Sequence, residues 1–157
     1  MMVLDYYKNG NLRNYYLNNQ HEDYSKNLST LLCIAIGLLS FHDAGFVHKD
    51  FHPGNILLNN NGPIIGDLGL CQPEHKEKKG VYGVLPYVAP EVLCGHQYTK
   101  AADIYSFGIV MNELLSEEIP YNDIPHDQNL TANICQGFRP KISEDIPKLF
   151  ADLIMKC

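Results

Sequence analysis

The clearest pattern in the sequence is a stretch of apolar residues at helical spacing between positions 28 and 42. Apolar side chains recur at positions 28, 31, 32, 35, 38 and 39, the spacing of one helix face, and further apolar residues fill the other faces. This pattern predicts a deeply packed helix from Leu28 to His42.

A second apolar segment predicts another central helix, from about Lys100 to Ser116. Thr99 precedes it as a suitable N-cap, and apolar residues occupy nearly every face. Asp103 falls in the first turn of this otherwise apolar helix. Because a buried carboxylate is costly unless it accepts hydrogen bonds, we expect Asp103 to have a structural partner.

Shorter elements are predicted around these two helices. Strand-like fragments at 56–58 and 63–65 are joined by an Asn-rich turn, so we expect a small hairpin, and another fragment lies at 3–4. Glycines and little periodicity between 67 and 90 predict a long loop. Further helices are expected at 12–17, 127–136 and 147–156.

Size and composition indicate one globular domain. The chain has 157 residues, of which 45% are apolar and 19% charged, close to the averages of soluble proteins. A chain of this length buries on the order of 70% of its extended surface, enough for a core. The formal net charge of −6 argues against a nucleic-acid partner, whose binding face is usually basic.

The cysteines and apolar runs indicate an intracellular protein without a membrane anchor. Five cysteines are scattered without a C-x-x-C pair, which does not suggest a disulfide framework or a zinc ribbon. The N-terminal apolar stretch is too short for a signal peptide, and the longest apolar run, Leu31 to Leu39, is far shorter than a membrane span. We therefore expect a cytoplasmic location and no membrane partner.

The segment VHKDFHPGNILL, residues 47–58, carries the candidate chemistry and allows three interpretations. His48 and His52 are four positions apart, as zinc ligands on a helix would be, but the Pro-Gly that follows disfavours a continuing helix and no third ligand stands at a recognisable spacing. The same Pro-Gly could mark an ordinary surface turn.

Phosphoryl transfer is the third interpretation. It needs a carboxylate to accept a hydroxyl proton, together with oxygen ligands for Mg²⁺. Asp50, Asn55 and Asp67 supply that set.

Four motifs in this order resemble those of a protein kinase: H-K-D-F-H-P-G-N at 48–55, D-L-G at 67–69, A-P-E at 89–91 and D-I-Y-S-F-G at 103–108. They look like the catalytic loop, the magnesium loop, the end of the activation segment and the central helix, in the style of the tyrosine-kinase-like group.

The resemblance covers the whole chain, 1–157, as a single partial kinase domain. Residues 1–11 resemble the hinge region between the lobes, and residues 12–157 resemble most of the C-terminal lobe. The implied fold is mainly α: a kinase-like helical lobe with a small β-hairpin at the catalytic and magnesium loops, a truncated form of the α+β kinase fold.

Carried over by position, the resemblance implies a catalytic set. Asp50 would orient and deprotonate the acceptor hydroxyl, Asn55 would bind magnesium, and Asp67 would bridge the metal to the phosphates. His52 stands where serine/threonine kinases carry lysine and would lie on the phosphate side. Lys49 replaces the usual arginine, so a phosphorylated activation loop would be bound more weakly, without a bidentate fork.

The same resemblance implies an ATP-binding edge and three structural residues. Backbone groups near Asp5 to Tyr7 would hold adenine, Asn11 would meet the ribose, and Leu57 would lie beneath the base, although a plain core position explains Leu57 almost as well. The structural residues are His48 in the internal packing, Asp103 as the acceptor of catalytic-loop backbone hydrogen bonds, and Glu91 as half of an ion pair.

Two other functions share part of this pattern. Small-molecule phosphotransferases of the aminoglycoside and choline type carry a similar H-x-D-x-H-P-x-N loop, but they lack the combination of A-P-E with D-x-Y-S-F-G. The other is a kinase-fold module that binds partners without catalysis. It differs from an active kinase only in activity, and the intact set of Asp50, Asn55 and Asp67 favours the active enzyme. The pattern therefore favours a protein kinase that uses ATP and Mg²⁺, acts on a protein Ser or Thr rather than Tyr, and works with other signalling proteins.

The sequence lacks parts that kinases use to hold phosphates. It contains no Gly-rich phosphate loop, no lysine in a V-A-I-K context and no partner-helix glutamate, because it begins at what resembles the hinge. We expect negligible kinase activity from the chain alone. The arginine that usually pairs with Glu91 would also lie further on, although Arg139 stands in the same region. Between Leu68 and Pro90 only Tyr82 and Tyr87 could accept phosphate, and we expect Tyr87 to be packed.

Overall fold

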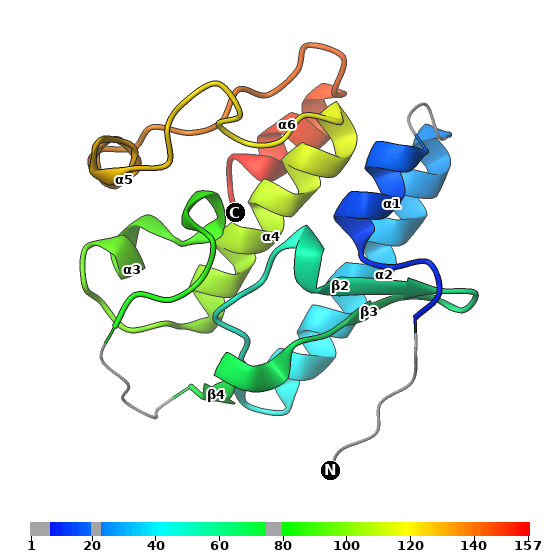
Figure 1. Ribbon diagram of the computed structural model, residues 1–157, viewed down its shortest axis with the longest axis horizontal. Helices are drawn as coiled ribbons and strands as arrows, with labels where there is room; N and C mark the ends of the chain where they lie inside the picture. The colour runs from blue at the N-terminus through cyan, green and yellow to red at the C-terminus, as the bar shows by residue number, and fades with distance from the viewer. Residues whose placement is uncertain (1–6, 20–22, 75–79) are drawn as a thin grey trace.

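The computed structural model describes residues 7–19, 23–74 and 80–157, which form a helical body with two small antiparallel strand pairs (Figure 1). The predicted fragment at 3–4 lies outside these residues. Helix α4 (Lys100–Ser116) runs through the middle and packs against α2 (Tyr24–Asp43) and α6 (Lys148–Ile154). The mainly α fold is that of a kinase C-terminal lobe, as the sequence predicts.

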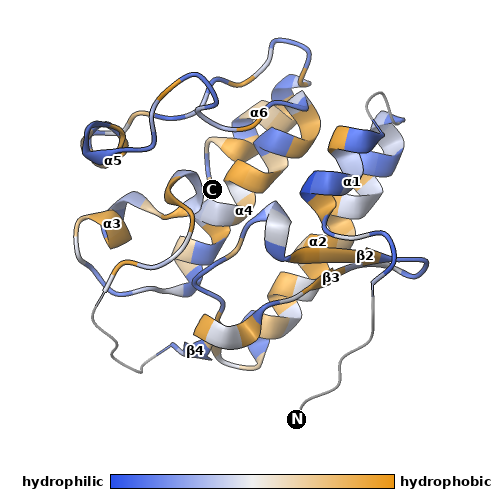
Figure 2. Ribbon diagram, in the orientation of Figure 1, coloured by the Kyte–Doolittle hydropathy of each residue, from blue (hydrophilic) through white to orange (hydrophobic). Residues whose placement is uncertain are grey.

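Helix α4 has the predicted bounds. Thr99 caps it, since its side chain accepts a hydrogen bond from the backbone N–H of Ala102. Most of its residues are buried, among them Val110 and Leu114 in the main core, and Figure 2 shows that α4 and α2 are coloured as hydrophobic over much of their length. The helix is apolar on nearly every side because it is surrounded by other elements.

Helix α2 begins four residues earlier than predicted, at Tyr24, because the Asp23 side chain caps it by accepting from Ser25 N at 3.2 Å. Its buried face is Leu31, Ile34 and Leu38, with Asn27 and His42. The expectation of a deeply packed helix holds for this face only, because Leu32, Ile36 and Leu39 are 61%, 55% and 59% exposed. Both triplets have helical spacing, and only the position of α4 and the hairpin decides which faces inward.

By length and composition, α2 is the one helix among the described residues that could cross a membrane, with a mean hydropathy of 1.3. The core helix of a soluble protein passes the same test. One face of α2, Leu31, Ile34 and Leu38, is buried in the main core, while its other apolar face is exposed.

The predicted hairpin is confirmed. Strands β2 (Ile56–Asn59) and β3 (Gly62–Ile65) pair antiparallel, with Asn59 opposite Gly62 at the turn. A second pair, β1 (Phe46–Val47) with β4 (Gln72–Pro73), was not predicted, because two-residue strands leave no periodicity. These two pairs fix the start and end of the loops that carry the candidate chemistry.

The remaining helices follow the predicted segments closely: α1 (Leu12–Asn18), α5 (Gln128–Cys135) and α6, which lies inside the predicted 147–156. Short helical turns lie at 53–55, 68–70 and 85–87, and a four-residue helix α3 (Pro90–Leu93) follows the last of them. Helix α3 packs against α5.

A buried polar cluster ties three of these elements together, and we call it the Glu113 cluster: Arg13, Tyr16, Tyr87 and Glu113. The Glu113 carboxylate is fully buried and accepts from Arg13 Nε at 3.0 Å and from the hydroxyls of Tyr16 and Tyr87. It therefore joins α1, α4 and the turn at 85–87 through one charged group.

Candidate active site

The loop from His48 to Asn55 is held in place by Asp103 of α4, which is 1% exposed. The Asp103 carboxylate accepts from the backbone N–H groups of His48 at 2.8 Å and Lys49 at 3.0 Å, and lies 2.9 Å from His42 Nε2. These contacts supply the partner that a buried carboxylate requires, and they fix the loop to the first turn of α4.

His48 is fully buried between the rings of Phe41 and Phe51, with centroids 6.0 and 5.7 Å away. Its Nε2 lies 3.0 Å from the Gly66 carbonyl oxygen and must donate, because a carbonyl only accepts. Its Nδ1 accepts from Asp50 N at 3.3 Å. His48 thus connects the Asp50 loop to the backbone just before Asp67.

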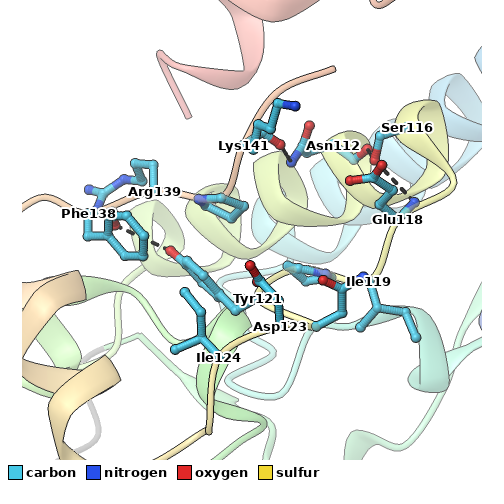
Figure 3. Close-up of a pocket in the computed structure, with 13 residues that line it drawn as sticks. Asn112, Ser116, Glu118, Ile119, Tyr121, Asp123, Ile124, Phe138, Arg139 and Lys141 are labelled. Carbon is cyan, nitrogen blue, oxygen red and sulfur yellow. Dashed lines mark hydrogen bonds between the residues drawn. The ribbon is translucent and has the colours of Figure 1, made fainter.

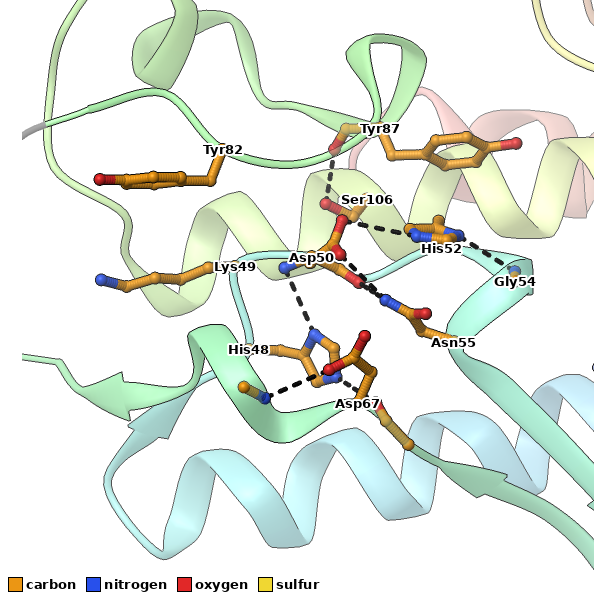
Figure 4. A network of polar contacts seen from close by, with 12 residues as sticks. His48, Lys49, Asp50, His52, Gly54, Asn55, Asp67, Tyr82, Tyr87 and Ser106 are labelled. Carbon is orange, nitrogen blue, oxygen red and sulfur yellow. Dashed lines mark hydrogen bonds and ion pairs between the residues drawn. The ribbon is translucent and has the colours of Figure 1, made fainter.

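Asp50 and Asn55 face one another across this loop, as Figure 4 shows. The Asn55 side-chain amide donates to the Asp50 backbone oxygen at 2.9 Å and to Asp50 Oδ2 at 3.0 Å. Asp50 Oδ1 accepts no hydrogen bond from any residue that the structure describes. Asp50 Oδ2 is therefore held by Asn55, while Oδ1 is a buried acceptor without a hydrogen-bond partner among these residues.

His52 approaches that second oxygen. Its Nδ1 accepts from Gly54 N at 3.0 Å, so Nε2 carries the proton of the neutral ring, and Nε2 lies 3.5 Å from Asp50 Oδ1. A side chain at Gly54 would place its Cβ 2.7 Å from His52 Cε1, so glycine is needed for the ring to sit there. The structure places His52 against Asp50.

The His52 N–H directed at the carboxylate, together with the Asn55 amide, holds the pKa of Asp50 below its ordinary value, while partial burial opposes the effect. Asp50 is therefore an ionised carboxylate near neutral pH, which is the state that can accept a proton.

Asp67 lies exposed at the end of β3, next to the loop. Its backbone φ of 52° is left-handed, a conformation that non-glycine residues rarely adopt, and Lys49 has φ of 73°. Asp67 Oδ1 accepts from Gly69 N at 3.4 Å, and Gly66 N donates to the backbone carbonyl oxygen of Asn55 at 2.7 Å. Such backbone strain is concentrated at functional sites.

The side-chain oxygens of Asn55 and Asp67 are hard donors, the type that Mg²⁺ binds. The two residues lie on segments joined by the hydrogen bond from Gly66 N to the Asn55 carbonyl oxygen, and Mg²⁺ usually takes only one or two protein ligands beside phosphates and water. The zinc interpretation has no such support: the His48 and His52 rings bond to different backbone groups, and no cluster of three His, Cys, Asp or Glu side chains occurs in the described part of the chain.

The structure brings together part of the predicted ATP-binding edge. Asn11 and Leu57 form an antiparallel bridge, and Leu58 N donates to the Gly10 oxygen at 2.9 Å. The Asn11 side-chain oxygen caps α1 by accepting from Asn14 N at 2.9 Å. Tyr7 is half-buried nearby in the chain, and Asp5 lies outside the described residues.

Lys49 points away from Asp50 and is buried. Its ammonium donates to Gln72 Oε1 at 2.7 Å and lies 5.5 Å from the centre of the Tyr98 ring. Of the two activation-segment tyrosines, Tyr82 is 39% exposed and Tyr87 is 3% exposed. Only Tyr82 is accessible to a modifying enzyme in this conformation.

Glu91, in α3, is half-buried, and Arg139 is directed elsewhere. The Arg139 guanidinium donates to the Phe138 oxygen at 3.0 Å and the Ile134 oxygen at 3.4 Å, and it lies 5.1 Å from the Tyr105 ring centre. Among the residues that the structure describes, no ion pair joins Arg139 to Glu91. Arg139 is therefore not the partner of Glu91.

Sequence analysis did not find the Glu113 cluster or His42. Glu113 sits in an apolar run, and its partners Arg13 and Tyr87 are 100 and 26 positions away, so no local pattern links them. His42 lies in the last turn of α2, and no sequence pattern indicated its contact with Asp103. The argument used for Asp103, that a carboxylate on a buried helix face needs a hydrogen-bond partner, could also have been applied to Glu113.

A cavity of about 370 Å³ lies elsewhere, at the C-terminal end of α4 (Figure 3). Asn112, Tyr121, Phe138 and Lys141 contribute to its walls, and Asn112 Nδ2 donates to the Lys141 oxygen at 3.0 Å. None of the predicted catalytic or ATP-binding residues lines it. The cavity is therefore separate from the candidate active site.

Comparison with known proteins agrees with this geometry. The family model described as "Protein kinase domain" matches residues 1–157. The chain belongs to the protein kinase family.

The relatives span a wide range of organisms. Two are from Arabidopsis thaliana: a "Protein kinase and PP2C-like domain-containing protein", 31% identical over 100% of this chain and 30% of the relative, and "Serine/threonine/tyrosine-protein kinase HT1", 31% identical over 99% of this chain and 41% of the relative. A "Probable serine/threonine-protein kinase gdt4" from Dictyostelium discoideum is 34% identical over 96% of this chain and 10% of the relative. The chain therefore spans less than half of each of these relatives.

Proposed function

We propose that this chain supplies the catalytic loop for ATP- and Mg²⁺-dependent phosphoryl transfer to a protein Ser or Thr hydroxyl. The observation that carries the proposal is the Asp50 carboxylate, with Oδ2 held by Asn55 and Oδ1 buried, approached by His52 Nε2 at 3.5 Å and able to accept a further hydrogen bond. The names of the relatives, serine/threonine kinases for the most part, support the acceptor class.

In this proposal Asp50 Oδ1 receives the hydrogen bond of the acceptor hydroxyl and takes its proton as the phosphoryl group is transferred. Asn55 keeps the carboxylate oriented through Oδ2, and the His52 N–H steadies it from the Oδ1 side. His52 thus acts on Asp50 as a positioning residue rather than as a phosphate-side cation.

Asn55 and Asp67 would hold Mg²⁺, which neutralises charge on the phosphates when bound. The Asn11–Leu57 bridge, with Tyr7 before it, would form the edge that meets adenosine, with Leu57 beneath the base and the Asn11 amide at the ribose. The half-buried position of Leu57 suits a side chain that a base covers.

The chain alone is proposed to have negligible activity. Phosphoryl transfer depends mainly on positioning and charge stabilisation, and the sequence contains neither a Gly-rich phosphate loop nor a strand lysine to hold the phosphates. The chain therefore needs these groups from a kinase small lobe.

Radiolabel transfer tests the proposal. The chain is joined at its N-terminus to a kinase small lobe that carries these groups, and is incubated with γ-labelled ATP, Mg²⁺ and protein substrates; the unjoined chain is the control. We expect label in phosphoserine or phosphothreonine with the joined protein, background with the unjoined chain, and loss of transfer when Mg²⁺ is chelated.

Other outcomes separate the alternatives. Label mainly in phosphotyrosine contradicts the acceptor class, and label in choline or an aminoglycoside instead of protein supports a small-molecule phosphotransferase. A joined protein that folds and binds ATP yet transfers nothing contradicts catalysis and favours a kinase-fold binding module.

A further inference from the structure

Two cysteines that are far apart in the sequence meet where α3 packs against α5. Cys94 follows the last residue of α3, and Cys135 is the last residue of α5 (Figure 1). The Pro90 carbonyl oxygen accepts from Cys94 N at 3.0 Å and from the Cys135 thiol at 3.8 Å. Because both contacts end at one oxygen atom, the Cys135 sulfur lies within side-chain reach of the Cys94 backbone.

The Cys94 side chain also affects the Cys135 thiol. A hydrogen bond with the Cys94 side chain raises the pKa of the Cys135 thiol, with a further contribution from burial. Cys94 is exposed and Cys135 is half-buried, so a small oxidant can reach the Cys94 thiol, and the Cys135 thiol lies close enough to react with it afterwards.

The other three cysteines are placed differently. Cys33 is exposed on α2, Cys71 is half-buried after the turn at 68–70, and Cys157 is half-buried against Gly108. No thiol–thiol contact is found for these three in the described part of the chain. The fold therefore selects one pair out of five cysteines.

We propose that Cys94 and Cys135 form a reversible intramolecular disulfide when the protein meets a peroxide. The Cys94 thiol gives up its proton, and its thiolate attacks one oxygen of hydrogen peroxide and becomes a sulfenic acid, while the O–O bond breaks and the other oxygen leaves as hydroxide, which takes up the released proton to form water. The Cys135 thiolate then attacks the Cys94 sulfur, the S–S bond forms, and the second oxygen leaves as water. Two thiols lose two electrons and two protons, and peroxide gains them. A cellular dithiol reverses the bond by exchange.

The bond would fasten the end of the 85–93 segment to α5. The turn at 85–87 already packs on α4, where Ser106 Oγ donates to the Tyr87 oxygen at 2.6 Å. Helix α5 belongs to a small apolar cluster with Tyr121, against which Leu85 and Leu93 of this segment pack. A covalent link would reinforce this packing and limit the freedom of the chain between the two cysteines in the unfolded state.

The test uses the purified chain and does not depend on phosphoryl transfer. The folded chain is treated with hydrogen peroxide and, separately, with diamide; free thiols are then alkylated, and the digest is analysed by mass spectrometry without reduction. We expect a linked peptide pair that contains Cys94 and Cys135, lighter than the two free peptides by two hydrogen atoms. Thermal unfolding of the oxidised chain should shift upward by about 5–10 °C.

Single substitutions supply the controls. Cys94→Ser and Cys135→Ser should each abolish the linked pair and the thermal shift, whereas Cys33→Ser should retain both. Dithiothreitol should restore the reduced mass, and oxidation in urea should yield mixed pairings because the fold no longer selects partners. A folded chain in which neither oxidant links Cys94 to Cys135, or in which Cys94 pairs with another cysteine or another molecule, overturns the inference.

Discussion

Glu113→Gln is expected to lower the free energy of unfolding by roughly 3–5 kcal/mol, the cost of breaking a buried ion pair on one side. Glu113 is fully buried, and its two oxygens accept from Arg13 and from the Tyr16 and Tyr87 hydroxyls. Glutamine keeps the shape but replaces one acceptor with an NH₂ group that faces donors. The Arg13 guanidinium would also lose its counter-charge.

Urea unfolding measures this effect, with Glu144→Gln, at an exposed position, as the matched control. The control should stay within about 0.5 kcal/mol of the unchanged chain. A Glu113→Gln chain that unfolds at the same urea concentration as the control would show that the Glu113 cluster contributes little to the free energy of unfolding, contrary to this prediction.

The cluster also predicts a loss of stability in alkali. Burial and the Glu113 charge raise the pKa values of Tyr16 and Tyr87 above the ordinary 10.0. Above that pH the unfolded state releases protons that the folded state keeps, so stability falls as pH rises. In Glu113→Gln the charge contribution is gone, and this pH slope should be shallower over the same range.

Asp103→Asn is expected to cost a similar amount, roughly 3–5 kcal/mol, and to loosen the loop that carries Asp50. The Asp103 carboxylate accepts two backbone N–H groups and faces His42 Nε2. An amide presents one NH₂ group where every neighbour is a donor or a histidine nitrogen, so at least one backbone N–H is left unpaired.

Amide hydrogen exchange can locate this effect. Protection should fall at His48 and Lys49 in Asp103→Asn and should be unchanged in Asp43→Asn, whose side chain is exposed at the end of α2. Full protection at both amides in Asp103→Asn would mean that the loop is held by other contacts.

The sequence predicts this fold best where one residue controls an element. Thr99 and the apolar run behind it predicted both ends of α4, and the Asn-Gly turn predicted the hairpin. Prediction failed where tertiary packing chooses between equivalent patterns, as on α2, where Leu31 and Leu32 have equal hydropathy and opposite burial.

Some features of the candidate site could likewise be predicted from the sequence, and others depend on tertiary packing. Motif spacing predicted that Asp50, Asn55 and Asp67 lie on adjoining segments, and burial arguments predicted a partner for Asp103. The position of His52 against Asp50 was not predictable, because it depends on the Gly54 N–H, which fixes the ring. The meeting of Cys94 and Cys135 depends on the packing of α3 on α5, which no local pattern encodes.

The central claim is that Asp50 is the proton acceptor of a protein kinase catalytic loop. The most direct test is the rate of phosphate transfer to a protein by the chain joined to a kinase small lobe, compared with the same protein carrying Asp50→Asn, with Asp43→Asn as the control. The account predicts that kcat falls by about 10²–10⁴-fold for Asp50→Asn, with little change in the KM for ATP and none in the control. Equal rates with aspartate and asparagine at position 50 would contradict it.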